Sequence, residues 1–253
     1  MTGLSTAPIK GLRLRSHELV ELGLGGVADD RRFYLIDAKG RMVNGKQLGS
    51  LTAVLADYDA GEGELSLRFP DGTTTSERVE LGARVQTRFH SRPREARLVI
   101  GPWAAALSDH AGQELRLVQP DAGTSAVDRG VGGGVSLMSR ASLARLEHAA
   151  ASGIDARRFR MLIEIDGVDA HAEDDWVGSR VRIGAALVLM RGHVGRCLVT
   201  SRDPDSGVVD LPTLDLLRGY RESTATTEPL AFGIYGEVIE EGRIALGDPV
   251  LPA

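Results

Sequence analysis

The only cysteine of the chain lies in the segment GHVGRCLVTSRDPDSG, residues 192–207. This segment joins a thiol to basic groups and hydroxyls, and it ends in a turn signal over residues 203–207. Positive charge on Arg196 and His193 favours the thiolate of Cys197, which is the form of cysteine that attacks or binds a metal. A lone cysteine is otherwise often a small buried hydrophobe on a strand, so the residues alone leave an inert, a reactive and a metal-binding thiol open.

Short alternations of apolar and polar residues recur along the rest of the chain. Turn signals such as Asp166-Gly167 and Gly247-Asp248-Pro249 separate them, which is typical of short strands. The pattern predicts a mainly β fold of the barrel or sandwich type. The alternating segments are residues 32–36, 65–69, 115–118, 162–165, 181–183 and 187–190.

Three segments carry helical signals instead. Residues 102–111 begin with a proline in the first turn and stop at a glycine. Residues 139–151 begin with Ser139, a residue type that caps helices, and residues 213–220 form the third candidate. We expect these helices to cover the β-barrels.

A long segment poor in apolar residues divides these elements into two groups. Residues 119–134 are rich in glycine, and a connection of this length is usually a linker or a functional loop. The 253 residues and their 42% hydrophobic content suffice for two domains of ordinary size. We therefore expect an N-terminal domain over residues 1–118 and a second domain over residues 119–253.

Charge and hydropathy exclude several classes of protein. The formal net charge of -5 argues against a general nucleic-acid binder, which needs a concentrated basic surface. No apolar run approaches the roughly 20 residues that span a bilayer, and the first residues do not resemble a signal peptide. One cysteine excludes a disulfide framework and a zinc or iron–sulfur site built of several cysteines. We expect a cytoplasmic protein with no membrane or nucleic-acid partner.

The segment around Cys197 resembles the core motif of MOSC domains, in which an Arg-Cys pair is followed by a threonine and an Asp-Pro-Asp-Thr-Gly turn. Six other segments resemble motifs of the same family, in the same order along the chain. They are residues 7–11, 30–35, 137–143, 158–160, 172–176 and 181–184. The members that the chain resembles most are the bacterial relatives of the mitochondrial amidoxime-reducing component, which carry an N-terminal β-barrel domain before a MOSC β-barrel domain.

The resemblance implies a molybdenum cofactor (molybdopterin) and assigns residues to it. Cys197 would be the catalytic residue that binds the metal, whose other sulfur ligands come from the dithiolene of the pterin. Lys10 and one of two adjacent arginines suit a phosphate, and we expect Arg32 to be that arginine because neighbours on a strand face opposite sides. The resemblance also allows pyridoxal phosphate as a ligand. The expected cofactor-binding residues are Lys10, Arg31, Arg32, Arg160, Arg196 and Thr200.

Several positions depart from the family pattern where the family contacts its cofactor. Gly11 stands in place of a serine, Leu162 in place of an asparagine, and the glycine run 132–134 in place of a hydroxyl-rich segment. These changes remove hydrogen-bond partners that a polar pterin requires. The glycine run either binds an anion through backbone N–H groups or is only a flexible loop. We expect the acidic residues 173–175 to begin a helix rather than to contact an anionic cofactor.

The function that the resemblance implies is the reduction of small N-hydroxylated compounds. The chain has neither a ferredoxin-type cysteine set nor a flavin or nicotinamide fingerprint, so electrons would come from an external donor protein. His193 and Asp203 are candidates for proton delivery. Two alternatives stay open: a carrier of the cofactor or of sulfur, and a divergent metal-free member that uses Cys197 as a nucleophile.

Overall fold

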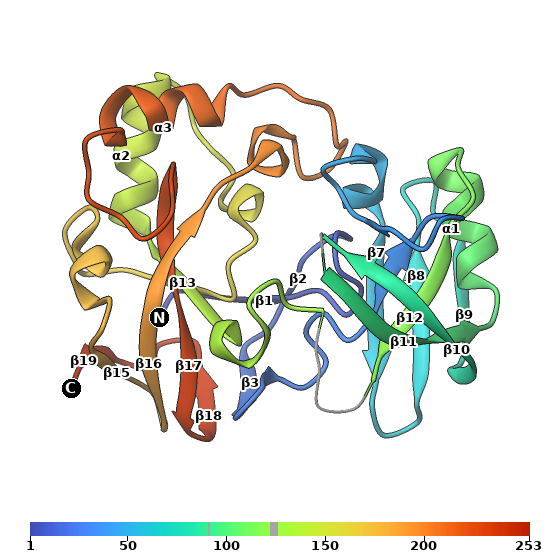
Figure 1. The fold of residues 1–253 in the computed structure, drawn as a ribbon. Helices are drawn as coiled ribbons and strands as arrows, with labels where there is room; N and C mark the ends of the chain where they lie inside the picture. The colour runs from blue at the N-terminus through green and yellow to red at the C-terminus, as the bar shows by residue number, and fades with distance from the viewer. Residues whose placement is uncertain (91, 122–125) are drawn as a thin grey trace.

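The computed structural model describes residues 1–90, 92–121 and 126–253. It consists of two lobes, both rich in β-strands, with helices at their outer surfaces (Figure 1). Residues 122–125 of the expected linker lie outside the described residues. The prediction of a mainly β fold with a few covering helices is confirmed.

Eight strands form one curled sheet in the C-terminal lobe. Its neighbours pair antiparallel except β13 and β14, whose bounds are given below. Parallel strands need a long crossover connection, and helix α2 (Arg140–Ala150) supplies it. In sheet order the strands are β19 (Val250–Pro252), β15 (Arg180–Ile183), β16 (Ala186–Gly195), β17 (Ala231–Glu240), β13 (Val135–Ser139), β14 (Ile163–Ile165), β1 (Gly3–Thr6) and β2 (Arg15–Ser16).

The first residues of the chain also pack with this lobe. Besides β1, the strands β3 (Leu19–Gly23) and β4 (Gly26–Val27) form a small sheet with β18 (Gly242–Ala245). Leu4 and Leu22 are buried in the same hydrophobic core as residues of β13 and β17. The division between residues 118 and 119 stays a prediction, and the structure adds that the chain enters the C-terminal lobe before it builds the other one.

The N-terminal lobe has a hydrophobic core of its own between two sheets. Trp103 is fully buried in it, and its indole N–H donates to the Leu65 carbonyl at 2.9 Å. One sheet has the order β10 (Glu80–Phe89), β11 (Arg92–Ile100), β12 (Arg116–Pro120), β5 (Tyr34–Ile36), β6 (Met42–Val43), and the other has the order β7 (Leu55–Asp59), β8 (Glu64–Arg68), β9 (Thr74–Arg78).

The described residues contain three α-helices, at the three segments that the sequence pattern indicated. Helix α1 (Trp103–Ala111) lies on the N-terminal lobe, whereas α2 and α3 (Thr213–Arg221) lie together on the C-terminal lobe (Figure 1). Ser139 caps α2, because its side chain accepts a hydrogen bond from the Ser142 N–H. None of the helices in the described part of the chain is long and apolar enough to cross a membrane.

Candidate functional site

A cavity of about 360 Å³ lies where the two lobes meet. Its wall comes from the loops after β1 and β6, from residues 127–129, 133–134 and 136, from the short helix η3 (Ala156–Phe159) and from the end of β16. Cationic side chains outnumber carboxylates in this wall, so the cavity attracts anions. The cations are Lys10, Arg31, Arg129, Arg158, Arg160 and Arg196, and the carboxylates are Asp30 and Asp128.

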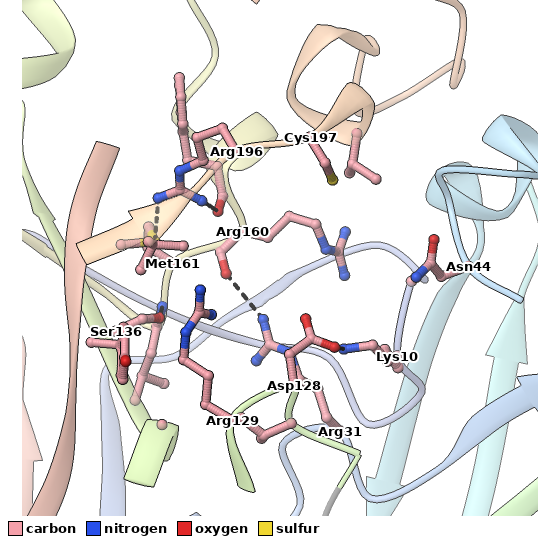
Figure 2. A pocket seen from close by; sticks show the side chains of 18 of the residues that line it. Lys10, Arg31, Asn44, Asp128, Arg129, Ser136, Arg160, Met161, Arg196 and Cys197 are labelled. Atoms are coloured by element: carbon pink, nitrogen blue, oxygen red, sulfur yellow. Dashed lines mark hydrogen bonds and ion pairs between the residues drawn. The ribbon is translucent and has the colours of Figure 1, made fainter. Parts of the chain in front are cut away.

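Cys197 lies at the edge of this cavity, and its sulfur points into it (Figure 2). The residue follows β16 directly and begins the short helix η5 (Leu198–Ser201). Its carbonyl accepts hydrogen bonds from both the backbone N–H and the hydroxyl of Thr200, each at 3.0 Å. The buried Thr200 therefore fixes the backbone at Cys197, because its hydroxyl is already committed to this bond.

The guanidinium of Arg196 lies among backbone carbonyls. It donates to the carbonyls of Phe159, at 2.8 Å, and Phe232, and to the sulfur of Met161 at 3.0 Å. Burial, with a smaller effect of the nearby Arg129, lowers the pKa of Arg196 to about 9. The side chain thus carries a positive charge at neutral pH, and among the described residues no carboxylate lies within ion-pair distance of it.

Arg160 is the second cation of this kind. Its backbone is left-handed, with φ of 54°, and its guanidinium donates to the Leu12 carbonyl at 2.6 Å. Its own carbonyl accepts a hydrogen bond from the Arg31 guanidinium at 3.0 Å. Burial, and then the charge of Arg31, lower the pKa of Arg160 to about 10.

The remaining cations of the wall have carboxylate partners. The Lys10 ammonium lies 2.8 Å from Asp128, and Arg31 forms an ion pair with Asp30. Arg129 donates to Glu228 at 2.6 Å, and Arg158 donates to both carboxylate oxygens of Asp210, at 2.7 and 2.8 Å. Among the described residues, Arg160 and Arg196 are the cations of this wall that have no carboxylate within ion-pair distance.

Asp128 also accepts a hydrogen bond from His90, whose Nε2 lies 2.8 Å away. Burial alone would raise the pKa of this carboxyl, but the His90 and Lys10 contacts outweigh it and hold the pKa well below its usual value. Burial of Lys10 lowers the pKa of its ammonium, although the charge of Asp128 opposes that shift. The cavity therefore contains an ionised carboxylate beside its buried lysine.

Arg32 does not line the cavity, and the preference for it over Arg31 is corrected. The expected strand begins only at Tyr34, because Arg31 has a left-handed backbone with φ of 52° in the preceding turn. This turn directs Arg31 into the wall, whereas the Arg32 guanidinium lies 4.8 Å from the ring centre of Tyr58 and 3.7 Å from Asp29. The other expected residues, Lys10, Arg160, Arg196, Thr200 and Cys197, all line the cavity.

Two of the glycines that depart from the family pattern, Gly11 and Gly134, have structural explanations. Gly11 has φ of 92°, and a Cβ there would lie 3.0 Å from the Cβ of Asn44, so a serine would be strained. A Cβ at Gly134 would lie 2.8 Å from the Gly25 carbonyl oxygen, so this residue too must be small. A hydroxyl is nevertheless present, because Ser136 lines the cavity and accepts a hydrogen bond from the Leu162 N–H at 3.1 Å.

Three polar residues that the sequence singled out have their side chains engaged outside this cavity. His193 lies in a second cavity, and its Nδ1 accepts a bond from the Thr227 N–H at 3.1 Å. Asp203 accepts bonds from the backbone of its own turn. Glu173 is fully buried and accepts bonds from the Ser139 N–H, at 3.0 Å, and the Ser142 hydroxyl, so this carboxylate is structural.

The expected site residues leave out four charged residues of the wall, and one of them, Asp30, directly precedes the expected Arg31. Asp128 and Arg129 lie in the glycine-rich segment, where the available signal is a pair of adjacent opposite charges next to a glycine run. Arg158 belongs to a motif that was recognised, but nothing in the spacing showed which of the arginines 157, 158 and 160 would face the cavity.

The described residues contain no group of three or more histidine, cysteine or acidic side chains that could hold a metal ion. A metal at Cys197 would therefore take its remaining ligands from a bound molecule. The wall offers that molecule a thiol at one edge and unpaired guanidinium groups farther in (Figure 2).

Comparison with known families agrees with this two-lobed arrangement. Residues 1–101 match the MOSC N-terminal beta barrel domain, and residues 126–251 match the MOSC domain. The chain belongs to the family of MOSC-domain proteins that carry this N-terminal β-barrel domain.

Among curated proteins, the chain is similar to the mitochondrial amidoxime-reducing components. It is 34% identical to component 1 of Xenopus laevis over 46% of this chain, but it spans only 35% of that protein's length. It is 27% identical to component 2 of Bos taurus over 95% of this chain and 78% of that protein. Among solved structures, the YUAD protein of Bacillus subtilis aligns with 98% of this chain and 91% of its own at a TM-score of 0.44 and 11% identity.

Proposed function

We propose that this chain is a molybdenum-cofactor enzyme that reduces N-hydroxylated small molecules, with Cys197 as the protein ligand of the metal. One observation carries the proposal: a thiol opens into a cavity whose guanidinium groups at Arg160 and Arg196 have no carboxylate partner among the described residues. A cation held away from bulk water costs free energy unless a counter-charge approaches it. The names of the similar amidoxime-reducing components support the choice of reaction.

The residues of the cavity fit such a cofactor. Arg160 and Arg196 suit the anionic and carbonyl groups of a pterin, because a guanidinium donates several hydrogen bonds in one plane. Ser136 and the backbone at Gly133 and Gly134 offer polar groups where the expected asparagine and hydroxyls are missing. Cys197 supplies the soft thiolate that suits a molybdenum centre.

When bound, the cofactor would supply two-electron redox chemistry at the metal. Two electrons and two protons convert an amidoxime to an amidine, and the hydroxyl oxygen leaves as water. The electrons would come from an external donor protein, because the sequence carries no second redox centre. A cytoplasmic location, with no membrane or nucleic-acid partner, belongs to the same proposal.

The contribution of the chain itself is to hold the ligand groups in place. Thr200 fixes the backbone of Cys197, and Glu228 accepts a bond from the Gly195 N–H at 3.0 Å, two residues before the cysteine. Arg129, which also binds Glu228, lies with its guanidinium 4.4 Å from the ring centre of Tyr235. These contacts join the end of β16 to the wall, so the sulfur keeps its direction into the cavity.

Metal analysis tests the proposal. Protein made in a host that synthesises the cofactor should contain near-stoichiometric molybdenum, and Cys197→Ser should lose it with little change in the free energy of unfolding, because the side chain is exposed. Turnover of benzamidoxime with a chemical reductant should disappear in the same variant. Wild-type protein without molybdenum that still turns over substrate would contradict the proposal.

Because Cys197 is exposed, a second candidate function is that of a carrier of the cofactor or of sulfur. A carrier would bind molybdenum without turnover, so the benzamidoxime assay separates the two functions. A metal-free nucleophile is less favoured, because among the described residues the thiol has no hydrogen bond to a histidine or a carboxylate that would activate it.

A further inference from the structure

The carboxylate of Asp128 lies inside the cation-lined cavity and contacts two of its basic side chains. One oxygen is 2.8 Å from the Lys10 ammonium and 2.8 Å from Nε2 of His90. The Lys10 side chain is 8% exposed and the Asp128 side chain 45% exposed. The lysine is therefore enclosed in the wall, whereas the aspartate lies in a turn and its side chain faces solvent on one side.

The position beside Lys10 is the one that an anionic group of a ligand would take. Arg31 and Arg160 lie close enough to Lys10 for their positive charges to lower the pKa of its ammonium. The lysine therefore lies in the cationic part of the cavity (Figure 2). A buried ammonium forms its strongest hydrogen bonds with an anion that contacts it directly. Asp128 already makes that contact, and a free anion must compete with it.

We propose that Asp128 is a built-in competitor that lowers the affinity of Lys10 for every added anion, so that only an anion with a further contact to a second cation, such as a phosphate group, binds measurably. This inference rests on the proposed function only in taking the cavity as the place where an anionic cofactor binds. A free carboxylate makes the same contact as Asp128 but lacks the advantage of attachment to the chain. A phosphate dianion carries more charge and more acceptor oxygens, so it gains contacts with Lys10 and its cationic neighbours together.

The departure of Asp128 has a structural route. His90 stands at the turn between β10 and β11 and is itself 56% exposed, so Asp128 keeps this partner when it leaves the lysine. The carboxylate then stays ionised and partly solvated instead of becoming an unpaired charge in the protein. A carboxylate that must first be displaced lowers the affinity for every anion, and an anion with no other contact then no longer binds measurably.

Calorimetric titration of the metal-free protein at pH 8 tests the inference with two simple probes, methyl phosphate and acetate. We expect wild-type protein to bind methyl phosphate and to show no measurable affinity for acetate. Asp128→Asn should tighten the binding of both probes by the same factor, about tenfold, because displacement of one carboxylate costs the same whichever anion displaces it. Acetate binding should then become measurable.

A control variant tests whether the loss of any negative charge is enough, and a double variant tests whether the effect of Asp128→Asn depends on Lys10. Asp175→Asn removes one charge from an exposed position in the second cavity and should leave both affinities unchanged. In a Lys10→Met background, Asp128→Asn should change the affinity for methyl phosphate less than twofold, because the contact that it relieves is gone.

Three results would overturn the inference. Asp128→Asn with unchanged or weaker phosphate binding would make Asp128 a group that positions Lys10 for the ligand. A larger gain for methyl phosphate than for acetate would show that Asp128 stays in place and only repels anions, since repulsion grows with the charge of the probe. Failure of every variant to bind phosphate would exclude a competitor at Lys10, while the molybdenum content of the loaded protein would still decide the proposed function.

Discussion

Two pairs of arginines, three of whose members line the cavity, differ in whether a carboxylate neutralises them. Arg157 binds Asp155 at 2.6 Å and Asp205 at 2.7 Å, and Arg158 binds both oxygens of Asp210. Arg160 and Arg196 bind only carbonyl oxygens and a sulfur among the described residues. The first pair anchors the loop that follows Cys197, whereas the second pair keeps its charge available. Sequence spacing alone does not separate a structural arginine from a ligand-binding one. The presence or absence of a carboxylate partner in the structure separates them.

Substitution of the two arginines without carboxylate partners tests the difference between the pairs most directly. Arg196→Met and Arg160→Met should each lower the molybdenum content at least about tenfold, which corresponds to the loss of one charge-assisted contact. The melting temperature should change far less, because removal of a partly buried charge without a carboxylate partner offsets the lost hydrogen bonds to carbonyls. Metal analysis and thermal unfolding of the same preparations measure both effects. A variant that keeps its molybdenum would show that the cavity does not use that guanidinium for a ligand.

The paired arginines should give the opposite pattern. Arg158→Met leaves Asp210 without its bidentate partner and should lower the free energy of unfolding by about 1–2 kcal/mol, a value reduced because Asp210 is half exposed. Urea denaturation measures this change. The molybdenum content should fall less than in Arg196→Met, since the guanidinium of Arg158 is already committed to the loop. Equal losses of metal in the two variants would remove the distinction between the pairs.

The pH dependence of the free energy of unfolding tests whether the Arg158–Asp210 pair is structural. Hydrogen bonds from Arg158 hold the pKa of Asp210 below its ordinary value. Because the pKa is depressed in the folded state, the unfolded chain takes up the proton first as the pH falls. The contribution of the pair is therefore present above about pH 4 and is lost as the pH drops through the folded value.

Chemical unfolding across the acid range checks this expectation. Asp210→Asn should make the free energy of unfolding fall less steeply below about pH 4, and Arg158→Met should do the same. Wild-type steepness in both variants would mean that other carboxylates account for the acid sensitivity of this loop.

The sequence predicted the elements of the fold better than the direction of individual side chains. The β pattern, the three helices and the Arg-Cys motif depend on local periodicity and on ordered motifs, and a single chain contains both. Which arginine faces the cavity depends on a backbone turn at residue 31, where φ is positive without a glycine to signal it. The contact between Asp128 and Lys10 joins residues far apart in the sequence, and no local pattern encodes a contact across that separation.

Neighbouring residues 31 and 32 offer the smallest and most closely matched test. Arg31→Met removes an ion pair with Asp30 and the hydrogen bond to the Arg160 carbonyl, so Arg160 loses part of its support, and the molybdenum content should fall about threefold to tenfold. Arg32→Met removes the same charge outside the cavity and should leave the metal content unchanged. Its lost packing on Tyr58 should cost about 0.5–1 kcal/mol in urea unfolding. A loss of metal in Arg32→Met but not in Arg31→Met would restore the order that strand alternation predicted, and the left-handed turn at Arg31 would no longer explain which side chain reaches the ligand.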